Sequence, residues 1–285
     1  MTVSAPTAPA PTCPPAAAIA NARMYAATPA IEDAWRALLA HVAEDAGVPL
    51  AYTPYPAPAP MDVLWARPDL GCALMCGYPI ALKLSPVVPI AAPIPAAPWA
   101  DGRPVYRTDL IVRADSPFRT LAETFGGTIG WTVEHSHSGF NAPRRHLLAH
   151  RTPECPTLYA GSVGPLVTPR KVLDAVLDGT IDVGPLDAYW HLLISRADPA
   201  LLAGIRVLGS TDTAPMPAFV AAAGADPDAV AAIRAALIGA ASRPWFAELA
   251  RILCLDGFAP VDQASFAPTL AWDADAVEAG YPRPA

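Results

Sequence analysis

The stretch TLYAGSVGPLVTPRKVLDAVLDGTIDVGPLDAYWHLLIS, residues 157–195, twice places a strand-like segment before a helix-like one. The apolar run 157–163 precedes an amphipathic pattern at 169–179, and the short run 181–184 precedes a second helical pattern that ends near residue 195. Strands that alternate with helices of this length are typical of parallel α/β layers. The stretch therefore predicts an α/β fold.

The same alternation extends on both sides of this stretch. Strand patterns at 105–118 and 128–132 are followed by a helical pattern at 143–150, and an amphipathic helix at 30–47 has a natural stop at Gly47. The other expected elements are strands within 22–29, 48–55 and 72–84, a proline-punctuated loop or edge segment at 87–104, a strand and turn at 205–222, and two helices within 226–253.

The strand segments 108–113 and 205–210 flank a self-contained α/β region in the middle of the chain. This arrangement predicts two lobes, with residues 108–204 inserted as the second lobe and residues 22–107 plus 205–285 forming the first. The hydrophobic pattern alone also allows one continuous doubly wound sheet. Residues 1–21 are rich in Pro and Ala without periodicity, and we expect them to form a disordered or extended lead.

Composition bounds the function classes. The chain has 285 residues, of which 53% are hydrophobic and 16% charged, as in a well-buried globular protein. The net charge is −7 and the 19 Lys and Arg are scattered, which argues against nucleic-acid binding. Any anion bound by this chain must therefore be held by local donors against the overall field.

The chain as written shows neither a secretory signal nor a membrane span. The N-terminal region lacks the basic segment and apolar core of a signal peptide, and no run approaches the ~20 apolar residues that cross a bilayer. The five cysteines are an odd number without a CxxC pair, which fits a reducing compartment better than a disulfide framework. These features favour a cytoplasmic location and no direct insertion into a membrane.

Small polar residues lie where a strand gives way to a helix, at Ser136, His137, Ser138 and Gly139. Helix N-terminal amides and serine hydroxyls can hold an oxyanion without any basic residue. An ordinary N-cap is the simpler interpretation and the one the local sequence favours, because Ser is among the commonest capping residues. A catalytic serine has little support, since the turn does not match G-x-S-x-G.

Histidines around this turn raise the alternative of a metal site. His135 and His137 alternate, while His146 and His150 share one helical face. No H-E-x-x-H motif and no carboxylate at ligand spacing accompanies them, so we expect no metal.

A carboxylate and three tryptophans are further candidates for a ligand site. Asp187 follows the apolar run 181–184, at the edge where open α/β sheets bind ligands, although a helix N-cap is an equally good interpretation. Trp65, Trp131 and Trp190 are candidates for the wall of such a site, but large aromatic residues are core residues first.

Five motifs follow one another along the chain in a recognisable order. They are RPDLGCALMCGYP (67–79), YRTDLIVRADSP (106–117), SHSGFNAPR (136–144), AGSVGPLVTPRKVLDAVLDGTIDVGPLDAYW (160–190) and STDTAPMP (210–217). Together they resemble the phosphate/phosphonate-type substrate-binding proteins of ABC transporters, over residues 22–250. The resemblance implies a type II periplasmic-binding-protein fold, with two α/β lobes joined by two hinge strands and closing on a small ligand.

The resemblance also implies a set of ligand-binding residues. Ser136, Ser138 and Gly139 would hold the anionic group of the ligand, with His137 between them, and Tyr78 would face the same cleft from the other lobe. Asp187 would accept hydrogen bonds from an amine or hydroxyl of the ligand. The remaining expected residues are Ser162, Trp131 and Trp190.

Two departures from the family pattern leave alternatives open. Val163 stands where many relatives have a histidine after the Gly-Ser of the second turn, which removes a polar contact expected for phosphonate. The family is periplasmic, whereas no export signal is apparent here. The implied function is reversible binding of a small anionic organic ligand, with an ABC permease or a sensor protein as partner and no cofactor. A cytosolic enzyme acting on a small cofactor precursor, with His137 as proton carrier, is the alternative.

Overall fold

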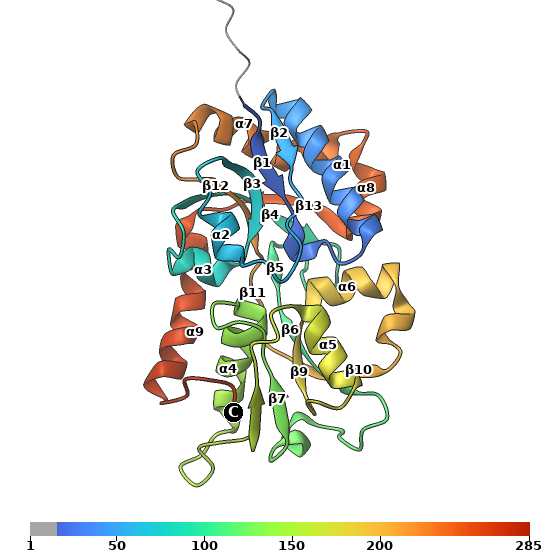
Figure 1. Cartoon of the computed structure of the whole chain (residues 1–285), viewed down its shortest axis with the longest axis vertical. Helices are drawn as coiled ribbons and strands as arrows, with labels where there is room; N and C mark the ends of the chain where they lie inside the picture. The colour runs from blue at the N-terminus through green and yellow to red at the C-terminus, as the bar shows by residue number, and fades with distance from the viewer. Residues whose placement is uncertain (1–15) are drawn as a thin grey trace, which may run out of the picture.

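The computed structural model describes residues 16–285, which form two α/β lobes stacked along the long axis (Figure 1). The first lobe contains a six-stranded mixed sheet in the order β13-β4-β12-β3-β1-β2. The strands β1, β2 and β3 are parallel, and β12, β4 and β13 complete the sheet in antiparallel pairs. Their bounds are β1 Ala18–Asn21, β2 Leu50–Tyr52, β3 Leu70–Met75, β4 Val87–Pro95, β12 Ala218–Ala222 and β13 Leu255–Pro260.

Helix α1 (Pro29–Ala46) covers one face of this sheet and ends where the sequence predicts. The Thr28 side chain accepts a hydrogen bond from the Ile31 amide at the start of the helix, and Gly47 adopts a left-handed φ of 64° at its end. Helices α7 (Pro227–Gly239) and α8 (Phe246–Leu253) pack against α1. The short helices α2 (Met61–Trp65) and α3 (Gly77–Ala81) lie on the other side (Figure 1).

The second lobe contains the sheet β10-β6-β9 and the parallel pair β7-β8, which a bridge between Ile129 and Val183 connects. Each strand–helix unit expected in this region is present, but the strand expected at 181–184 lies at 184–187 and the one expected at 157–163 is confined to 161–163. The strands are β6 Thr108–Arg113, β7 Thr128–Gly130, β8 Gly161–Val163, β9 Gly184–Asp187 and β10 Ile205–Ser210, and the helices are α4 Ala142–Leu147, α5 Pro169–Leu177 and α6 Ala188–Ala197.

Two short strands carry the chain between the lobes. β5 (Val105–Tyr106) and β11 (Ala214–Pro215) pair antiparallel at the waist of the molecule (Figure 1). The segments 108–113 and 205–210, expected to flank the inserted lobe, pair with each other inside the second lobe's sheet. Residues 205–210 therefore lie in the second lobe, whereas the sequence assigned them, with the rest of 205–285, to the first lobe.

The C-terminal segment forms a third connection. Helix α9 (Ala267–Glu278) contacts α3 in the first lobe and α4 in the second, and the chain ends against the second lobe (Figure 1). The buried guanidinium of Arg144 in α4 pairs with Asp273 of α9 and donates to the Pro282 carbonyl. Residues 267–285 thus contact the second lobe and do not belong to the first lobe alone. The sequence does not indicate this contact, because the partners lie far away along the chain.

Two local expectations are wrong. The strand expected within 22–29 lies at 18–21, inside the segment expected to be a disordered lead, and a short 3₁₀ turn occupies Arg23–Tyr25. Residues 1–15 of that lead lie outside the described residues. The proline-rich segment 87–104 contains β4, which is an interior strand paired on both sides, not a loop or edge. The strand accommodates its prolines with a register shift beside Pro89, and the side chain of Arg234 donates to the carbonyls of Pro89 and Ile90 there.

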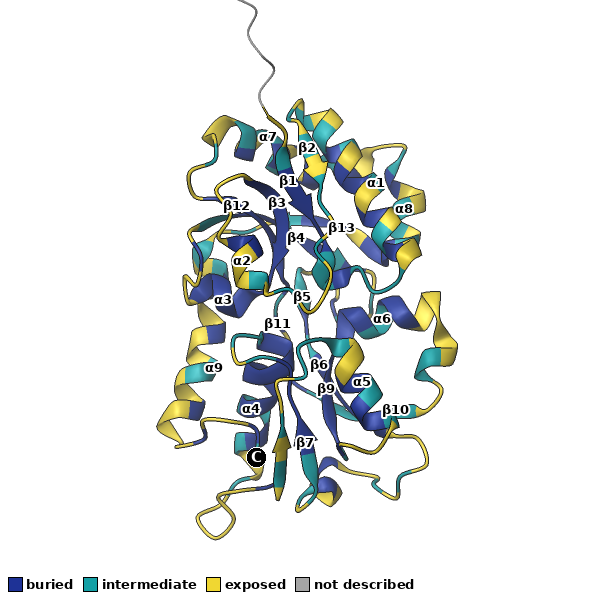
Figure 2. Ribbon diagram, viewed as in Figure 1, coloured by how far each residue is buried: buried dark blue, intermediate teal, exposed yellow. Residues whose placement is uncertain are grey.

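The core runs through the centre of both sheets (Figure 2). The apolar core is continuous between the lobes, because the buried ring of Tyr25 in the first lobe contacts the ring of Tyr189 in the second lobe edge-on, with the ring centres 4.7 Å apart. Within residues 16–285, no helix is long and apolar enough to span a bilayer.

Candidate functional site: a cleft between the lobes

A cleft of about 660 Å³ opens between the two lobes. Segments that follow the parallel strands of the first lobe form one wall, since the carboxyl ends of β1, β2 and β3 all face the second lobe. The opposite wall consists of the segment after β7, the end of β9 and the beginnings of α5 and α6. This placement matches the general position of ligand sites in open α/β sheets.

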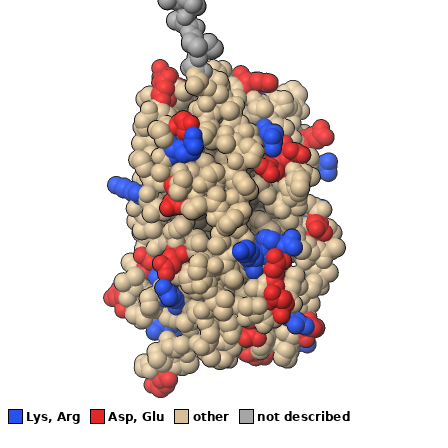
Figure 3. Space-filling view, viewed as in Figure 1, with Lys and Arg blue, Asp and Glu red and all other residues tan. Residues whose placement is uncertain are grey.

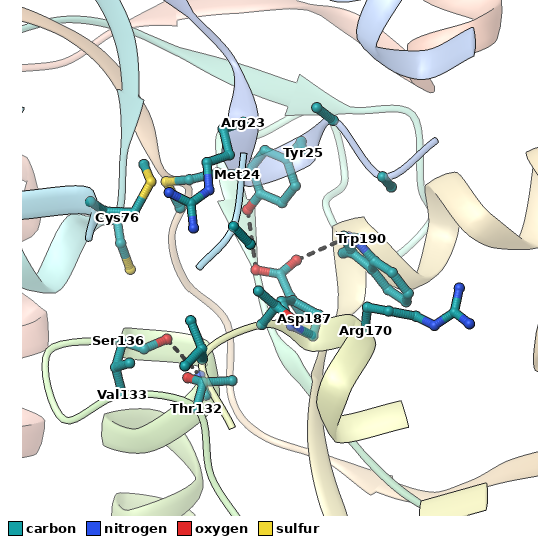
Figure 4. Close-up of a pocket in the computed structure, with 18 of the residues that line it drawn as sticks. Arg23, Met24, Tyr25, Cys76, Thr132, Val133, Ser136, Arg170, Asp187 and Trp190 are labelled. Carbon is teal, nitrogen blue, oxygen red and sulfur yellow. Dashed lines mark hydrogen bonds between the residues drawn. The ribbon is translucent and has the colours of Figure 1, made fainter. Parts of the chain in front are cut away.

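The Ser136–Gly139 turn forms part of the second-lobe wall (Figure 4). Ser136 caps a wide helical turn, His137–Asn141, because its Oγ accepts a 3.0 Å hydrogen bond from the Gly139 amide. The N-cap interpretation is therefore confirmed. Glycine is required at 139, because a Cβ there would lie 1.9 Å from the Oγ1 of Thr132.

The turn is also held from behind. Thr108 in β6 donates its hydroxyl to the Ser138 carbonyl at 2.9 Å, and the side-chain amide of Asn141 donates to the Thr269 carbonyl of α9 at 2.8 Å. The Thr132 amide donates to the Gly139 carbonyl at 3.1 Å. The turn that carries the cleft hydroxyls is thus held by Thr108 and Asn141 outside the cleft and by the backbone of Thr132, as a preorganised binding site needs.

Asp187, the last residue of β9, lies at the bottom of the cleft and caps α6. Its Oδ1 accepts hydrogen bonds from the amides of Tyr189 and Trp190, both at 3.0 Å. Its Oδ2 accepts from the Ser138 hydroxyl at 3.1 Å and from the Tyr25 hydroxyl of the first lobe at 3.2 Å. Burial raises the pKa of Asp187 to about 6 although these four hydrogen bonds act in the opposite direction.

This network gives the two serines different chemical characters. Ser138 donates its proton to Asp187, so its oxygen lone pairs remain for a donor on a ligand. Ser136 accepts from the Gly139 amide, and its own proton has no acceptor among residues 16–285. Ser136 is therefore suited to donate to an anion, whereas Ser138 and Asp187 form an acceptor side.

Cations and aromatic side chains complete the lining. Lys and Arg side chains gather near the middle of the face in Figure 3, over the beginning of α5, where Arg170 and Lys171 border the cleft. Arg170 is paired with Asp174 on the same helix. Much of the remaining wall is apolar and includes Trp65 and Trp190.

Of the nine residues expected from the sequence, five line this cleft and four lie elsewhere. The five are Ser136, Ser138, Gly139, Asp187 and Trp190. The four are His137, Tyr78, Trp131 and Ser162.

His137 turns away from the cleft. Its ring lies between Tyr106 and Trp272, where burial lowers its pKa to about 3, and its Nε2 has no partner among the described residues. The ring is therefore neutral at physiological pH and cannot reach a ligand. Because the turn presents alternate side chains to opposite sides, its two serines face the cleft and His137 faces α9.

The other three residues have structural partners. Tyr78 lies beside Asp273 and Arg144, and burial raises the pKa of its phenol to about 12. The Trp131 indole donates to Ser162 Oγ at 3.1 Å, and that hydroxyl donates to the Pro284 carbonyl at 2.6 Å. The C-terminal segment thus occupies the place where the family resemblance put part of the ligand site.

The histidine pair His146 and His150 does not assemble a metal site. Their rings lie 6.1 Å apart and tilted, and residues 16–285 contain no cluster of three metal-ligating side chains.

Sequence reasoning missed several polar residues of the cleft, among them Arg23, Tyr25 and Thr132. Arg23 and Tyr25 directly follow β1, the first strand of a parallel sheet, so their place at its carboxyl end was the available signal. The sequence does not reveal this position, because residues 22–29 are themselves expected to form the strand.

The profile of the family described as "ABC transporter, phosphonate, periplasmic substrate-binding protein" matches residues 25–266. Among curated proteins, no relative matches the chain.

Among solved structures, a binding protein component of an ABC phosphonate transporter from Pseudomonas aeruginosa is similar, with a TM-score of 0.78 at 14% identity over 93% of this chain and 87% of that one. PhnD1 from Prochlorococcus marinus in complex with methylphosphonate has a TM-score of 0.74 at 11% identity, covering 91% and 97%. A Xanthomonas citri protein bound to ATP has a TM-score of 0.65 at 19% identity, covering 93% and 98%. These likenesses establish the two-lobed periplasmic-binding-protein fold.

Proposed function

The chain belongs to the family of periplasmic substrate-binding proteins of ABC phosphonate transporters, and on this premise we propose that it captures a small organic anion reversibly in the cleft between its lobes. The observation that carries the proposal is the Ser136–Gly139 turn, which places hydroxyl groups on one wall of the cleft, opposite residues of the other lobe. A ligand held by both walls favours the closed arrangement of the lobes, since it binds that state better.

The polarity of the site indicates the kind of ligand. Ser136 offers a proton to an anionic group, while Ser138 and Asp187 offer lone pairs to an amine or hydroxyl nearby. A compound with an oxyanion and a hydrogen-bond donor satisfies both sides. Sites with such fixed donors and acceptors discriminate well, because the wrong ligand leaves buried polar groups unpaired.

The volume of the cleft supports a ligand larger than phosphonate alone. About 660 Å³ lies in the range of sites for drug-sized molecules, and the wall contains Trp65 and Trp190. The similar proteins from Prochlorococcus marinus and Xanthomonas citri bind methylphosphonate and ATP, respectively. Both compounds contain a phosphorus oxyanion, so we expect such a group with an apolar or aromatic body attached.

We propose binding without covalent chemistry. The enzyme alternative uses His137 as its proton carrier, but the buried neutral ring of His137 points away from the cleft. His135, next to the turn, does line the cleft. We propose an ABC permease as the partner and the periplasm as the working compartment, because the matching family is described as the periplasmic substrate-binding proteins of ABC transporters. A sensor role would instead require a stable complex with another protein after ligand binding.

Removal of both serine hydroxyls tests the proposal. We expect Ser136→Ala/Ser138→Ala to weaken binding of the wild-type protein's best probe, methylphosphonate or ATP, at least tenfold, about 1.4 kcal/mol. Calorimetric titration of ligand-free protein measures this, with Ser195→Ala as a matched control, because Ser195 is exposed on α6 outside the cleft. Equal affinity of the double variant and wild type would mean that the serines only cap the helical turn and do not hold the ligand.

A further inference from the structure

Arg23 is a cation in the cleft without a carboxylate partner. It follows β1, lies half-buried in the first-lobe wall, and forms no ion pair among residues 16–285. One guanidinium nitrogen donates to the Ala59 carbonyl, and the group lies 5.5 Å from the centre of the Tyr55 ring. A guanidinium has five N–H donors, so these contacts orient the side chain and leave most of its donors free.

Thr132 is a buried hydroxyl without a partner in the opposite wall. Its side chain lines the cleft just after β7, the residue is only 4% exposed, and its Oγ1 forms no hydrogen bond with any described residue. A buried hydroxyl left unpaired is costly, so natural proteins rarely keep one without a ligand or water to satisfy it. Thr132 lies directly against Gly139, beside the Ser136 hydroxyl.

Both residues line the same cleft, from different lobes, and the Thr132 hydroxyl lies covered beneath Gly139. In Figure 4, Arg23 enters from the first lobe, while Thr132 and Ser136 lie on the second-lobe side. We propose that Arg23 and Thr132 complete the anion site, so that one oxyanion of the ligand is held by Arg23 of the first lobe and by the hydroxyls of Thr132 and Ser136 of the second. The inference rests on the proposed function and specifies how the ligand's charge is neutralised.

This arrangement also addresses the negative charge in the cleft. Asp187 would repel a bound anion, and neutral hydroxyls alone do not offset a carboxylate in a poorly solvated site. Arg170 is already paired with Asp174, and Lys171 is exposed at the mouth of the cleft. Arg23 is therefore the half-buried positive charge available to the ligand.

The guanidinium geometry narrows the ligand class. Its planar fork fits two oxygens of one group, as in phosphonates, phosphate esters and sulfonates, and a lysine ammonium does not reproduce that fit. Because the anion would contact both lobes, its charge contributes directly to closure. Neutral analogues of the same size should bind poorly.

The test is calorimetric titration of ligand-free protein with methylphosphonate, phenylphosphonate and ATP as probes. We expect Arg23→Gln to weaken binding of the best probe at least tenfold and Arg23→Lys to recover only part of it. Thr132→Val, nearly equal in shape, should weaken binding several-fold, and Thr132→Ser should restore it. The matched control is Arg36→Gln, on α1 outside the cleft.

The melting temperature of each ligand-free variant shows whether it folds, and the nearly isosteric Thr132→Val keeps the test valid if Arg23 variants do not fold. If wild type binds a probe while Arg23→Gln and Thr132→Val bind it equally well, the inference is wrong and the proposed function stands. If wild type binds none of the probes, both are wrong for this class of anion.

Discussion

The buried carboxyl of Asp187 makes a sharp prediction about stability and pH. Its pKa is raised from the ordinary 3.8 to about 6, mainly because burial disfavours the charged form. Well below pH 3.8 the carboxyl is protonated in both the folded and unfolded states. As pH rises through 4 to 6 the unfolded state loses this proton first, so the free energy of unfolding decreases, and the loss is complete above the folded pKa.

The size of the effect follows from the shift. About two pKa units at 1.36 kcal/mol each correspond to about 3 kcal/mol of stability lost between pH 4 and pH 7.5. Asp187→Asn removes this loss, because an amide stays neutral at every pH. The asparagine oxygen can still accept from the amides of Tyr189 and Trp190, and Asn is as good an N-cap as Asp.

Urea denaturation of wild type and Asp187→Asn across this pH range gives the difference in unfolding free energy directly, since other titrating groups are common to both proteins. We expect the difference to shift in favour of the variant by up to about 3 kcal/mol as pH rises from 4 to 7.5. The matched control is Asp226→Asn, at the exposed N-cap of α7. A shift in favour of wild type, or parallel curves, would refute the reasoning that burial dominates at Asp187.

Two further substitutions test the support of the site. Gly139→Ala should destabilise the fold by about 2 kcal/mol and weaken binding, because its methyl group would overlap the hydroxyl of a threonine just after β7. Thermal unfolding measures the loss of stability, and the control is Gly224→Ala, whose methyl group would meet open space. An equal loss of stability in the two variants would contradict the explanation. Asp273→Asn should cost about 3 kcal/mol, because it leaves the buried guanidinium of Arg144 without an oppositely charged partner. Asp275→Asn, in an exposed pair, should change the urea midpoint little, and similar effects of both substitutions would argue against the connection through α9.

The strand–helix units and the location of the site could be predicted from the sequence because they are local. The 3.6-residue and two-residue patterns each report on contiguous residues, the Ser-x-Ser-Gly turn follows β7, and Asp187 is the last residue of β9. Those residues line the cleft because the carboxyl edges of the strands converge there.

The errors arose where the deciding partner is distant in sequence. Tyr78 and Ser162 have partners in residues 267–285, such as Asp273 and Pro284, and no pattern in their own segments reveals this. His137 was assigned to the site with its neighbouring serines, although adjacent residues of the turn face opposite sides. Arg23 and Thr132 were missed because the two walls of the cleft come from segments that are distant in sequence. Only the fold brings these two residues to one cleft.

The thermal unfolding of ligand-free protein against phosphate, phosphonates, sulfonates, carboxylates and phosphorylated heterocycles tests the central claim most directly. A ligand at ~100 times its dissociation constant adds ~2.7 kcal/mol, which raises the midpoint of a chain of this size by several degrees. Reversible capture of an anion predicts such a rise with at least one phosphorus- or sulfur-centred oxyanion, and recovery of that compound chemically unchanged. No rise with any of the anions, or conversion of the compound into a product, would contradict the account.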